Sequence, residues 1–248
     1  MQILGTRKTR TTGQKLAERL DANYIEGRPH RDDVTIRYGN GYSVDPEGIV
    51  INKRDAIRNC VNKIRCKEIL MQNNINTPKL YTFQEASNLL RNSDSQVVVR
   101  KNGHSQGRWF YLVNNVRQLS RYDSNSHYCQ ELVNKIDEYR LFIMKDRIIE
   151  ANLKVPPEND PHSMIRNHTH GSTFRIAPVR NLNQTMKDQA RKATELLGLD
   201  FAAIDCATTR LSDGTIKPTI FEVNTGPSLT VDRKLDLFVA KLHQLCNI

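Results

Sequence analysis

The chain reads Phe221-Glu222-Val223-Asn224-Thr225-Gly226-Pro227-Ser228 near its C-terminal end, and no other stretch is as informative. An earlier apolar run, Phe201-Ala202-Ala203-Ile204-Asp205-Cys206, carries one carboxylate. Asp213-Gly214 lies between the two runs and is a turn signal, so we expect a hairpin of two antiparallel strands. Alternation along the second strand places Glu222 and Asn224 on one face, which Asp205 on the neighbouring strand can join.

Oxygen-bearing side chains at these three positions suit a hard cation. Mg²⁺ takes carboxylate and amide oxygens and often shares its coordination with nucleotide phosphates. The alternative is a hairpin that presents polar residues to water on one face. Three such residues among strongly apolar neighbours favour a metal site, so we predict Mg²⁺, with Mn²⁺ as a substitute ion, at Asp205, Glu222 and Asn224.

The composition is that of an ordinary globular protein: 248 residues, 38% hydrophobic and 26% charged. No apolar run approaches the roughly 18 residues of a membrane span, and the N-terminus lacks the apolar core of a signal peptide. The five cysteines form no CxxC pair, a distribution typical of reduced thiols in the cytoplasm. We therefore expect a cytoplasmic protein without membrane partners.

The net charge of +10 favours anionic partners such as nucleotide triphosphates, acidic peptides or nucleic acid. One tryptophan, no recognised nucleic-acid motif and no dense basic tract argue against nucleic acid.

Helical and strand patterns are mixed along the chain, and the strands pair mostly as hairpins, which indicates an α+β fold. We expect three parts: a small N-terminal segment over residues 1–57, a first subdomain over 58–128 and a second over 129–248. The clearest helices are expected at 63–72, 84–90, 183–197 and 232–245. The clearest strands are expected at 34–38, 96–100, 108–113, 128–133, 139–144 and 147–154.

A glycine-bearing loop, Lys101-Asn102-Gly103-His104-Ser105-Gln106-Gly107, separates two of these strands. Its glycines and serine would let backbone N–H groups approach phosphate oxygens. The GxxxxGK[ST] pattern is absent, and taken alone the loop is better explained as a plain hairpin connection.

The order of motifs from about residue 62 to residue 228 resembles the ATP-grasp superfamily. The resemblance is strongest to carboxylate–amine ligases related to the ribosomal-protein glutamate ligase. It implies an α+β ATP-grasp fold, in which two α+β subdomains clasp ATP, here preceded by a shortened N-terminal α/β segment. Part of the acceptor site would then be reduced, or supplied by a partner chain in a homo-oligomer or by the substrate itself.

The resemblance also implies roles for individual residues in nucleotide binding. Lys63 matches a lysine that reaches the ATP phosphates. Arg100 stands where the family usually has a second phosphate-binding lysine, and the adjacent Lys101 is the alternative. The remaining cofactor-binding matches are the phosphate-loop residues Ser105, Gln106 and Gly107, the adenine-binding backbone of Glu131 and Val133, and the ribose-binding carboxylate of Glu138.

The catalytic matches are Arg140, Lys154 and Asn167, near the γ-phosphate and the reacting acid, and Asp205, Glu222 and Asn224 match the family's magnesium ligands. The implied activity is an ATP- and Mg²⁺-dependent, ADP-forming ligase that joins a carboxylate to an amine through an acyl phosphate. Its partners would be ATP, an acidic small molecule or peptide, and an amine co-substrate. The alternative is a non-catalytic nucleotide-binding or interaction module of the same fold.

Overall fold

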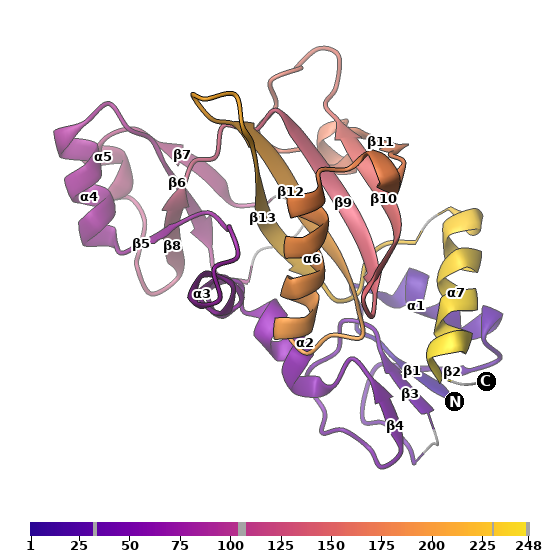
Figure 1. Ribbon diagram of the computed structural model, residues 1–248. Helices are drawn as coiled ribbons and strands as arrows, with labels where there is room; N and C mark the ends of the chain where they lie inside the picture. Colours follow the sequence, from indigo (N-terminus) through magenta and orange to yellow (C-terminus); the bar gives the residue numbers. More distant parts are fainter. Residues whose placement is uncertain (32–33, 104–107, 230, 247–248) are drawn as a thin grey trace.

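The described residues form three β-sheets with helices packed on them (Figure 1). The computed structural model describes residues 1–31, 34–103, 108–229 and 231–246. Within these ranges, no helix combines the length and the apolar character that crossing a bilayer requires.

The N-terminal sheet is parallel and has the strand order β2-β1-β3-β4. Helix α1 follows β1, and the C-terminal helix α7 packs beside it, so the two ends of the chain lie together (Figure 1). The elements are β1 (Gln2–Leu4), α1 (Arg10–Arg19), β2 (Asn23–Ile25), β3 (Val34–Arg37), β4 (Ile49–Ile51) and α7 (Asp232–Cys246).

A small antiparallel sheet with the order β5-β8-β6-β7 forms a separate lobe (Figure 1). Ala86, Leu90 and Leu119 from its two helices cover one face of the sheet. Helices α2 and α3 connect this lobe to the N-terminal sheet. The elements are α2 (Arg54–Val61), α3 (Lys63–Gln72), β5 (Leu80–Tyr81), α4 (Phe83–Asn92), β6 (Val97–Lys101), β7 (Phe110–Val113), α5 (Val116–Leu119) and β8 (His127–Glu131).

The central sheet is antiparallel, with the order β11-β10-β9-β12-β13. Helix α6 lies across one of its faces (Figure 1). The elements are β9 (Asp137–Met144), β10 (Arg147–Val155), η1 (His168–His170), β11 (Thr173–Ile176), η2 (Val179–Asn181), α6 (Gln184–Leu196), β12 (Phe201–Arg210) and β13 (Ile216–Asn224).

The two faces of the central sheet differ in character. Leu141 and Ile204 point to the first face, where Met186 of α6 covers them. The second face is apolar only near the N-terminal sheet, where Phe142 and Phe201 join a core that includes residues of β1, α1 and α7. Polar side chains occupy the rest of this second face. The N-terminal sheet is therefore built onto the central sheet and shares its core.

Most of the expected elements are present, with ends displaced by a few residues. The hairpin of β12 and β13 is confirmed, and Gly214 in its turn has a φ of 83°, a conformation that favours glycine. Gly198 after α6 has a φ of 70°, as a glycine at a helix end often does. The strand expected at 128–133 ends earlier, at Glu131, so Val133 lies in the connection to β9. The proposed boundaries at 57/58 and 128/129 stay a prediction.

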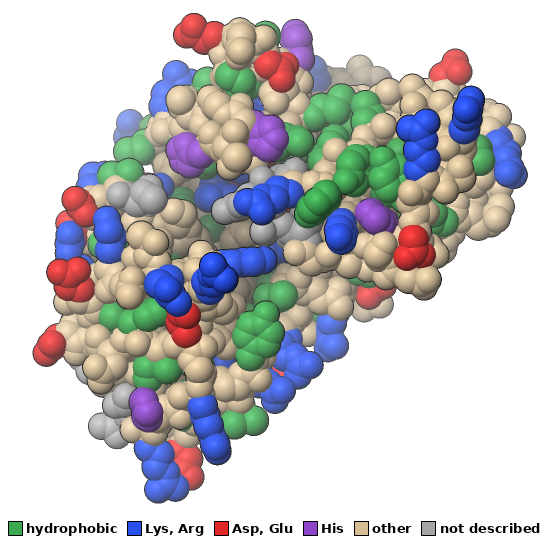
Figure 2. Space-filling view, turned by 180° about the vertical axis from the view of Figure 1, so that it is seen from behind, with side chains coloured by type: hydrophobic (Ala, Val, Ile, Leu, Met, Phe, Trp, Pro, Cys, Tyr) green, Lys and Arg blue, Asp and Glu red, His purple; other side chains and the backbone are tan. Residues whose placement is uncertain are grey.

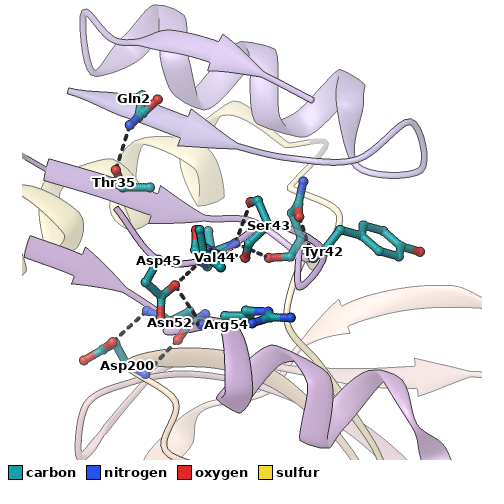
Figure 3. A network of polar contacts seen from close by, with 11 residues as sticks. Gln2, Thr35, Tyr42, Ser43, Val44, Asp45, Asn52, Arg54 and Asp200 are labelled. Atoms are coloured by element: carbon teal, nitrogen blue, oxygen red, sulfur yellow. Dashed lines mark hydrogen bonds and ion pairs between the residues drawn. The ribbon is translucent and has the colours of Figure 1, made fainter. Parts of the chain in front are cut away.

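A fully buried arginine organises the loop that follows β3. Arg37 is 0% exposed and donates to Asp45 Oδ1 at 2.6 Å, to Ser43 O at 2.9 Å and to Val44 O at 2.7 Å. Its remaining group, Nη1, donates to Asn40 O and to Ser43 Oγ. Figure 3 labels the acceptor residues Ser43, Val44 and Asp45 and shows the ring of Tyr42, a residue that is 84% exposed, pointing away from them. The guanidinium therefore fixes the backbone of a loop that would otherwise be held by few contacts.

Replacing Arg37 with methionine should lower the free energy of unfolding by about 2–5 kcal/mol, because several acceptors of the loop would lose their shared, buried donor together. Urea unfolding measures the change. The matched control is Arg31→Met, since the Arg31 side chain is 87% exposed and lies 3.5 Å from Glu47; it should cost less than about 0.5 kcal/mol. Equal losses in the two variants would contradict this account of Arg37.

Candidate active site

The polar part of the central sheet is assembled by strand register. Asp205 on β12 lies directly opposite Glu222 on β13 and opposite Arg140 on β9. Arg140 in turn lies opposite Asn152 on β10. Because side chains on paired residues share a face, these strands present their functional groups to the same side of the sheet. We call this the polar face.

Asp205 is the most heavily paired carboxylate on the polar face. Its side chain is 6% exposed. Arg140 binds it in a bidentate manner, Nε to Oδ1 at 2.7 Å and Nη2 to Oδ2 at 2.8 Å, and Lys154 Nζ lies 2.9 Å from Oδ2. Burial alone would raise the pKa of Asp205, but the charges of Arg140 and Lys154 outweigh burial and hold the pKa below its ordinary value.

Glu138 is the second buried carboxylate, and it is held by two lysines. Lys154 Nζ lies 2.6 Å from its Oε1, and Lys135 donates to its Oε2. The resemblance assigns ribose binding to Glu138. Both of its oxygens already accept a lysine, so a ribose hydroxyl would have to share an oxygen with one of them.

Glu222 is paired with the first residue of α3. Lys63 Nζ lies 2.7 Å from Glu222 Oε1 and 3.4 Å from the carbonyl of Val223. Burial opposes the charge of Lys63, but Glu222 more than offsets this and raises the pKa of Lys63 above its ordinary value. The lysine predicted to bind phosphate and a carboxylate predicted to bind metal are therefore in direct contact.

The third predicted metal ligand, Asn224, lies two residues beyond Glu222 on the same strand. Its Nδ2 is buried and has no hydrogen-bond partner. An orphaned buried amide of this kind suggests a ligand or water that completes its environment. Within the described ranges, no three His, Cys, Asp or Glu side chains come together as a metal site. The residues present fit a divalent ion that would use Asp205, Glu222 and the Asn224 oxygen and complete its coordination with phosphate oxygens.

The small sheet supplies the opposite wall. Arg100 is half-buried. Burial lowers its pKa, and the nearby Tyr128 and Glu222 partly offset this. Lys101 is exposed, and its Nζ lies 5.0 Å from the centre of the Trp109 ring. Of the two candidates for the phosphate contact, Arg100 is thus the one near the predicted metal ligands.

Three other predicted nucleotide contacts, Ser105, Gln106 and Gly107, lie outside the described residues. Glu131 ends β8, and its backbone N–H donates to Lys79 O at 2.8 Å. A contact with adenine would therefore fall to the carbonyl group of Glu131. Val133 is half-buried in the following connection.

The last predicted catalytic residue, Asn167, caps the start of the short helix η1. Its Oδ1 accepts from the backbone N–H of His170 at 2.9 Å. The next residue, His168, stacks on Phe174 with ring centres 4.4 Å apart, and the Phe174 ring lies 5.7 Å from the Arg140 guanidinium. The Asn167 loop therefore packs, through two aromatic rings, against the arginine that holds Asp205.

Several polar-face contacts were not predicted from the sequence. Glu150 of β10 binds Arg233 at 2.7 Å and Lys234 at 2.9 Å, both from the start of α7. Alternation along β10 places Glu150 and Asn152 on the same face as Lys154 and is the signal that could have found them. Lys135 lies in a loop and reaches Glu138 only through tertiary structure, so no local pattern marks it.

Cations outnumber carboxylates at this site. Figure 2 shows lysine and arginine side chains gathered in and around the hollow between the small lobe and the rest of the molecule. The cationic side chains next to the site carboxylates Glu138, Asp205 and Glu222 are Lys63, Lys135, Arg140 and Lys154, with Lys67 and Arg100 close by. Such an excess attracts and holds a polyanion.

Comparison with known proteins identifies the fold. No protein-family model matches the sequence, and no curated protein matches it. Solved structures do match. One is the ATP-grasp ligase PsnB complexed with minimal precursor, Mg and ADP, with a TM-score of 0.67 and 14% sequence identity. The match covers 98% of this chain and 96% of that chain. D-alanine–D-alanine ligase from Bacillus anthracis complexed with ATP gives 0.67 at 15% identity, with 99% and 97% covered.

The macrocyclase MdnC bound with precursor peptide MdnA from Microcystis aeruginosa MRC gives a TM-score of 0.65 at 12% identity, with 98% of this chain and 100% of that chain covered. The likeness spans nearly the whole chain in each case, so it includes the parallel N-terminal sheet. The chain has the α+β fold of the ATP-grasp ligases.

The ion pairs of Asp205 should make stability pH-dependent in a definite direction. Its folded pKa lies below that of the unfolded chain, so the pairs stabilise the fold at neutral pH, and this contribution is lost as the pH falls below about 4 toward the folded pKa. Asp205→Asn should cost roughly 3–5 kcal/mol at pH 7, because it leaves Arg140 without its carboxylate partner and Lys154 with only Glu138.

Urea unfolding of wild type and Asp205→Asn between pH 7 and pH 3 measures the difference, which should shrink below about pH 4. The exposed Asp160→Asn serves as control and should differ little from wild type at any pH. A difference for Asp205→Asn that is constant across this range would contradict the assignment.

Proposed function

We propose that this protein is an ATP- and Mg²⁺-dependent, ADP-forming ligase that joins a carboxylate to an amine. The observation that carries the proposal is the pairing of Asp205 with Glu222 on one face of the central sheet, with Asn224 beside them and cations around them. The fold supports it, since structures of the same fold hold ADP with Mg, or ATP.

Asp205, Glu222 and Asn224 would hold a Mg²⁺ ion, and the charge of this ion would neutralise part of the phosphate charge. The protein's own cations would do the rest. Lys63 approaches the polar face from α3 and Arg100 from the small lobe, while Arg140 and Lys154 lie on the central sheet. If a triphosphate bound between these cations, they would exchange their carboxylate partners for phosphate oxygens. Each buried cation would therefore stay paired with negative charge.

The reaction that suits this arrangement has two steps. In the first, an oxygen of the substrate carboxylate attacks the γ-phosphorus, the bond from that phosphorus to the β,γ-bridging oxygen breaks, and ADP leaves. In the second, the amine nitrogen attacks the acyl carbon, the bond from that carbon to the phosphoryl oxygen breaks, and phosphate leaves with loss of an amine proton. Both steps are catalysed mainly by positioning and charge neutralisation, which is what the fixed cations provide.

The acceptor side of the site is walled by the N-terminal sheet. The Tyr38 hydroxyl donates to the carbonyl of Pro227. A Cβ on Gly226 would lie 2.6 Å from Thr9 Cγ2 and 3.3 Å from Gly39 Cα, so this glycine permits close contact between the two segments. The turn at 225–228 is thereby fixed, which suits it to hold the reacting acid.

We infer that the acid is carried by a peptide. PsnB complexed with precursor peptide PsnA2 and MdnC bound with precursor peptide MdnA share the fold, and the net positive charge of this chain favours an acidic peptide. The five cysteines are free and buried, in keeping with the reduced thiols of a cytoplasmic enzyme. ADP release that needs only free amino acids would argue against a peptide.

A second function, a non-catalytic nucleotide-binding module, is favoured only by Arg100 in the place of the usual lysine. ADP release from ATP separates the two functions: a ligase needs both an acid and an amine for turnover, whereas a module binds ATP without releasing ADP. Screening acidic peptides with amines for coupled ADP release is the direct experiment.

Glu222→Gln should lower Mg²⁺-dependent ADP release by about 10²–10³-fold, as loss of one charge-stabilising group commonly does. The control is Glu195→Gln, since Glu195 is exposed on α6; it should retain wild-type rates. Wild-type turnover by Glu222→Gln would refute the role of this carboxylate.

Arg100→Lys should retain turnover within about tenfold if the side chain makes a single phosphate contact, because an ammonium also binds phosphate. Steady-state ADP release at saturating ATP measures this. An inactive Arg100→Lys that still binds ATP would mean that the planar fork of the guanidinium is required.

A further inference from the structure

Strand β13 contains one extra residue at the predicted metal site. Its pairing with β12 runs from Ala203 with Asn224 to Asp205 with Glu222, and then continues from Cys206 with Ile220. Phe221 has no partner on β12, which is the pattern of a β-bulge.

The bulge determines which way Glu222 points. Ile220 faces the apolar cluster under α6, and so does Val223. Strict alternation from Ile220 would turn Glu222 toward the same apolar cluster. The extra residue reverses the alternation, so that Glu222 faces the polar side with Asp205 and Asn224. Without the bulge, the carboxylate of Glu222 would not lie on the same face of the sheet as that of Asp205.

The bulge is held from outside the sheet by α3 and the segment after it. β13 is the edge strand of the central sheet. Lys67 Nζ donates to the carbonyl of Phe221 at 3.1 Å and to Thr77 Oγ1 at 3.3 Å. The N–H of Ile220 donates to Asn76 O at 2.8 Å. The bulged residue therefore has its carbonyl fixed by a lysine one helical turn after Lys63.

Burying the Lys67 ammonium in this position lowers the stability of the fold. Lys67 is 4% exposed, and both of these acceptors are neutral oxygens, so neither forms an ion pair with it. Burial, with a smaller contribution from Arg100, lowers its pKa to about 8. A buried ammonium that gains so little for its desolvation destabilises the fold relative to an apolar residue, which indicates that the residue serves the site.

We propose that Lys67 is a positioning residue: by holding the Phe221 bulge, it keeps Glu222 turned toward Asp205 for a nucleotide-bound divalent cation. The inference rests on the proposed function, because the proposed function is what makes Glu222 a metal ligand. Lys67 itself touches neither metal nor substrate in this account.

The test compares wild type with Lys67→Met, which keeps the length of the side chain but cannot donate. Calorimetry measures ADP binding with and without Mg²⁺, and hydrogen exchange measures the amides of β13 in the protein without nucleotide. Lys67→Met should lose at least about tenfold of the Mg²⁺-dependent gain in ADP affinity, the equivalent of one charge-assisted hydrogen bond. Its metal-free ADP affinity should stay within about twofold, and the amides around Phe221 should exchange faster.

The matched control is Arg65→Met, an exposed cation on the same helix, which should leave all three readouts unchanged. If Lys67→Met does not fold, Thr77→Val removes one of the ammonium's acceptors and should give the same changes in smaller measure. A full Mg²⁺-dependent gain in Lys67→Met, or equal losses with and without Mg²⁺, would overturn the proposal. Failure of the proposed function would appear differently, as a wild type whose ADP affinity does not respond to Mg²⁺. Unchanged hydrogen exchange of the β13 amides in Lys67→Met would show that Lys67 does not hold the Phe221 bulge, and would overturn the proposal whether or not the wild type binds ADP and Mg²⁺.

Discussion

Asp205 and Glu222 stand side by side on neighbouring strands; Asp205 is buried and paired with Arg140 and Lys154, and Glu222 is half-buried and paired with Lys63. Carboxylates so placed are stable only while positive charge compensates them, and the cations are stable only while the carboxylates or another anion are present. This mutual dependence explains why the polar face is dense with lysine and arginine. In the proposed function, a triphosphate would pair with these cations while a divalent ion would bind the carboxylates.

The rest of the architecture keeps this face in place. α6 covers the opposite side of the central sheet with an apolar layer, so the strands have only one polar side. The N-terminal sheet and α7 cover the end of the polar face where Phe142 and Phe201 lie. The small lobe brings Arg100 toward the same face. The buried Arg37 stiffens the loop after β3, and Tyr38, the next residue, contacts the turn that follows Asn224.

The sequence predicted the elements whose signals are local. Alternation and the Asp213-Gly214 turn were enough for the hairpin of β12 and β13, and the order of motifs was enough for the fold. Alternation grouped Glu222 with Asn224 correctly, but the bulge at Phe221 was not foreseen. It is set by where β13 meets β12 and by the bond from Lys67, neither of which is visible along the strand. Lys135 and the pairing of Glu150 with α7 were missed for the same reason. The phosphate contact of Arg100 stays a prediction, which the structure supports because Arg100 is half-buried near Glu222 whereas Lys101 is exposed.

The most direct test of the central claim is a crystal structure with ADP and Mn²⁺, in which anomalous scattering locates the metal. We predict a Mn²⁺ ion within coordination distance of oxygens from Asp205, Glu222 and Asn224, bridged to the ADP phosphates. A nucleotide bound elsewhere, or a metal that leaves all three side chains uncoordinated, would contradict it.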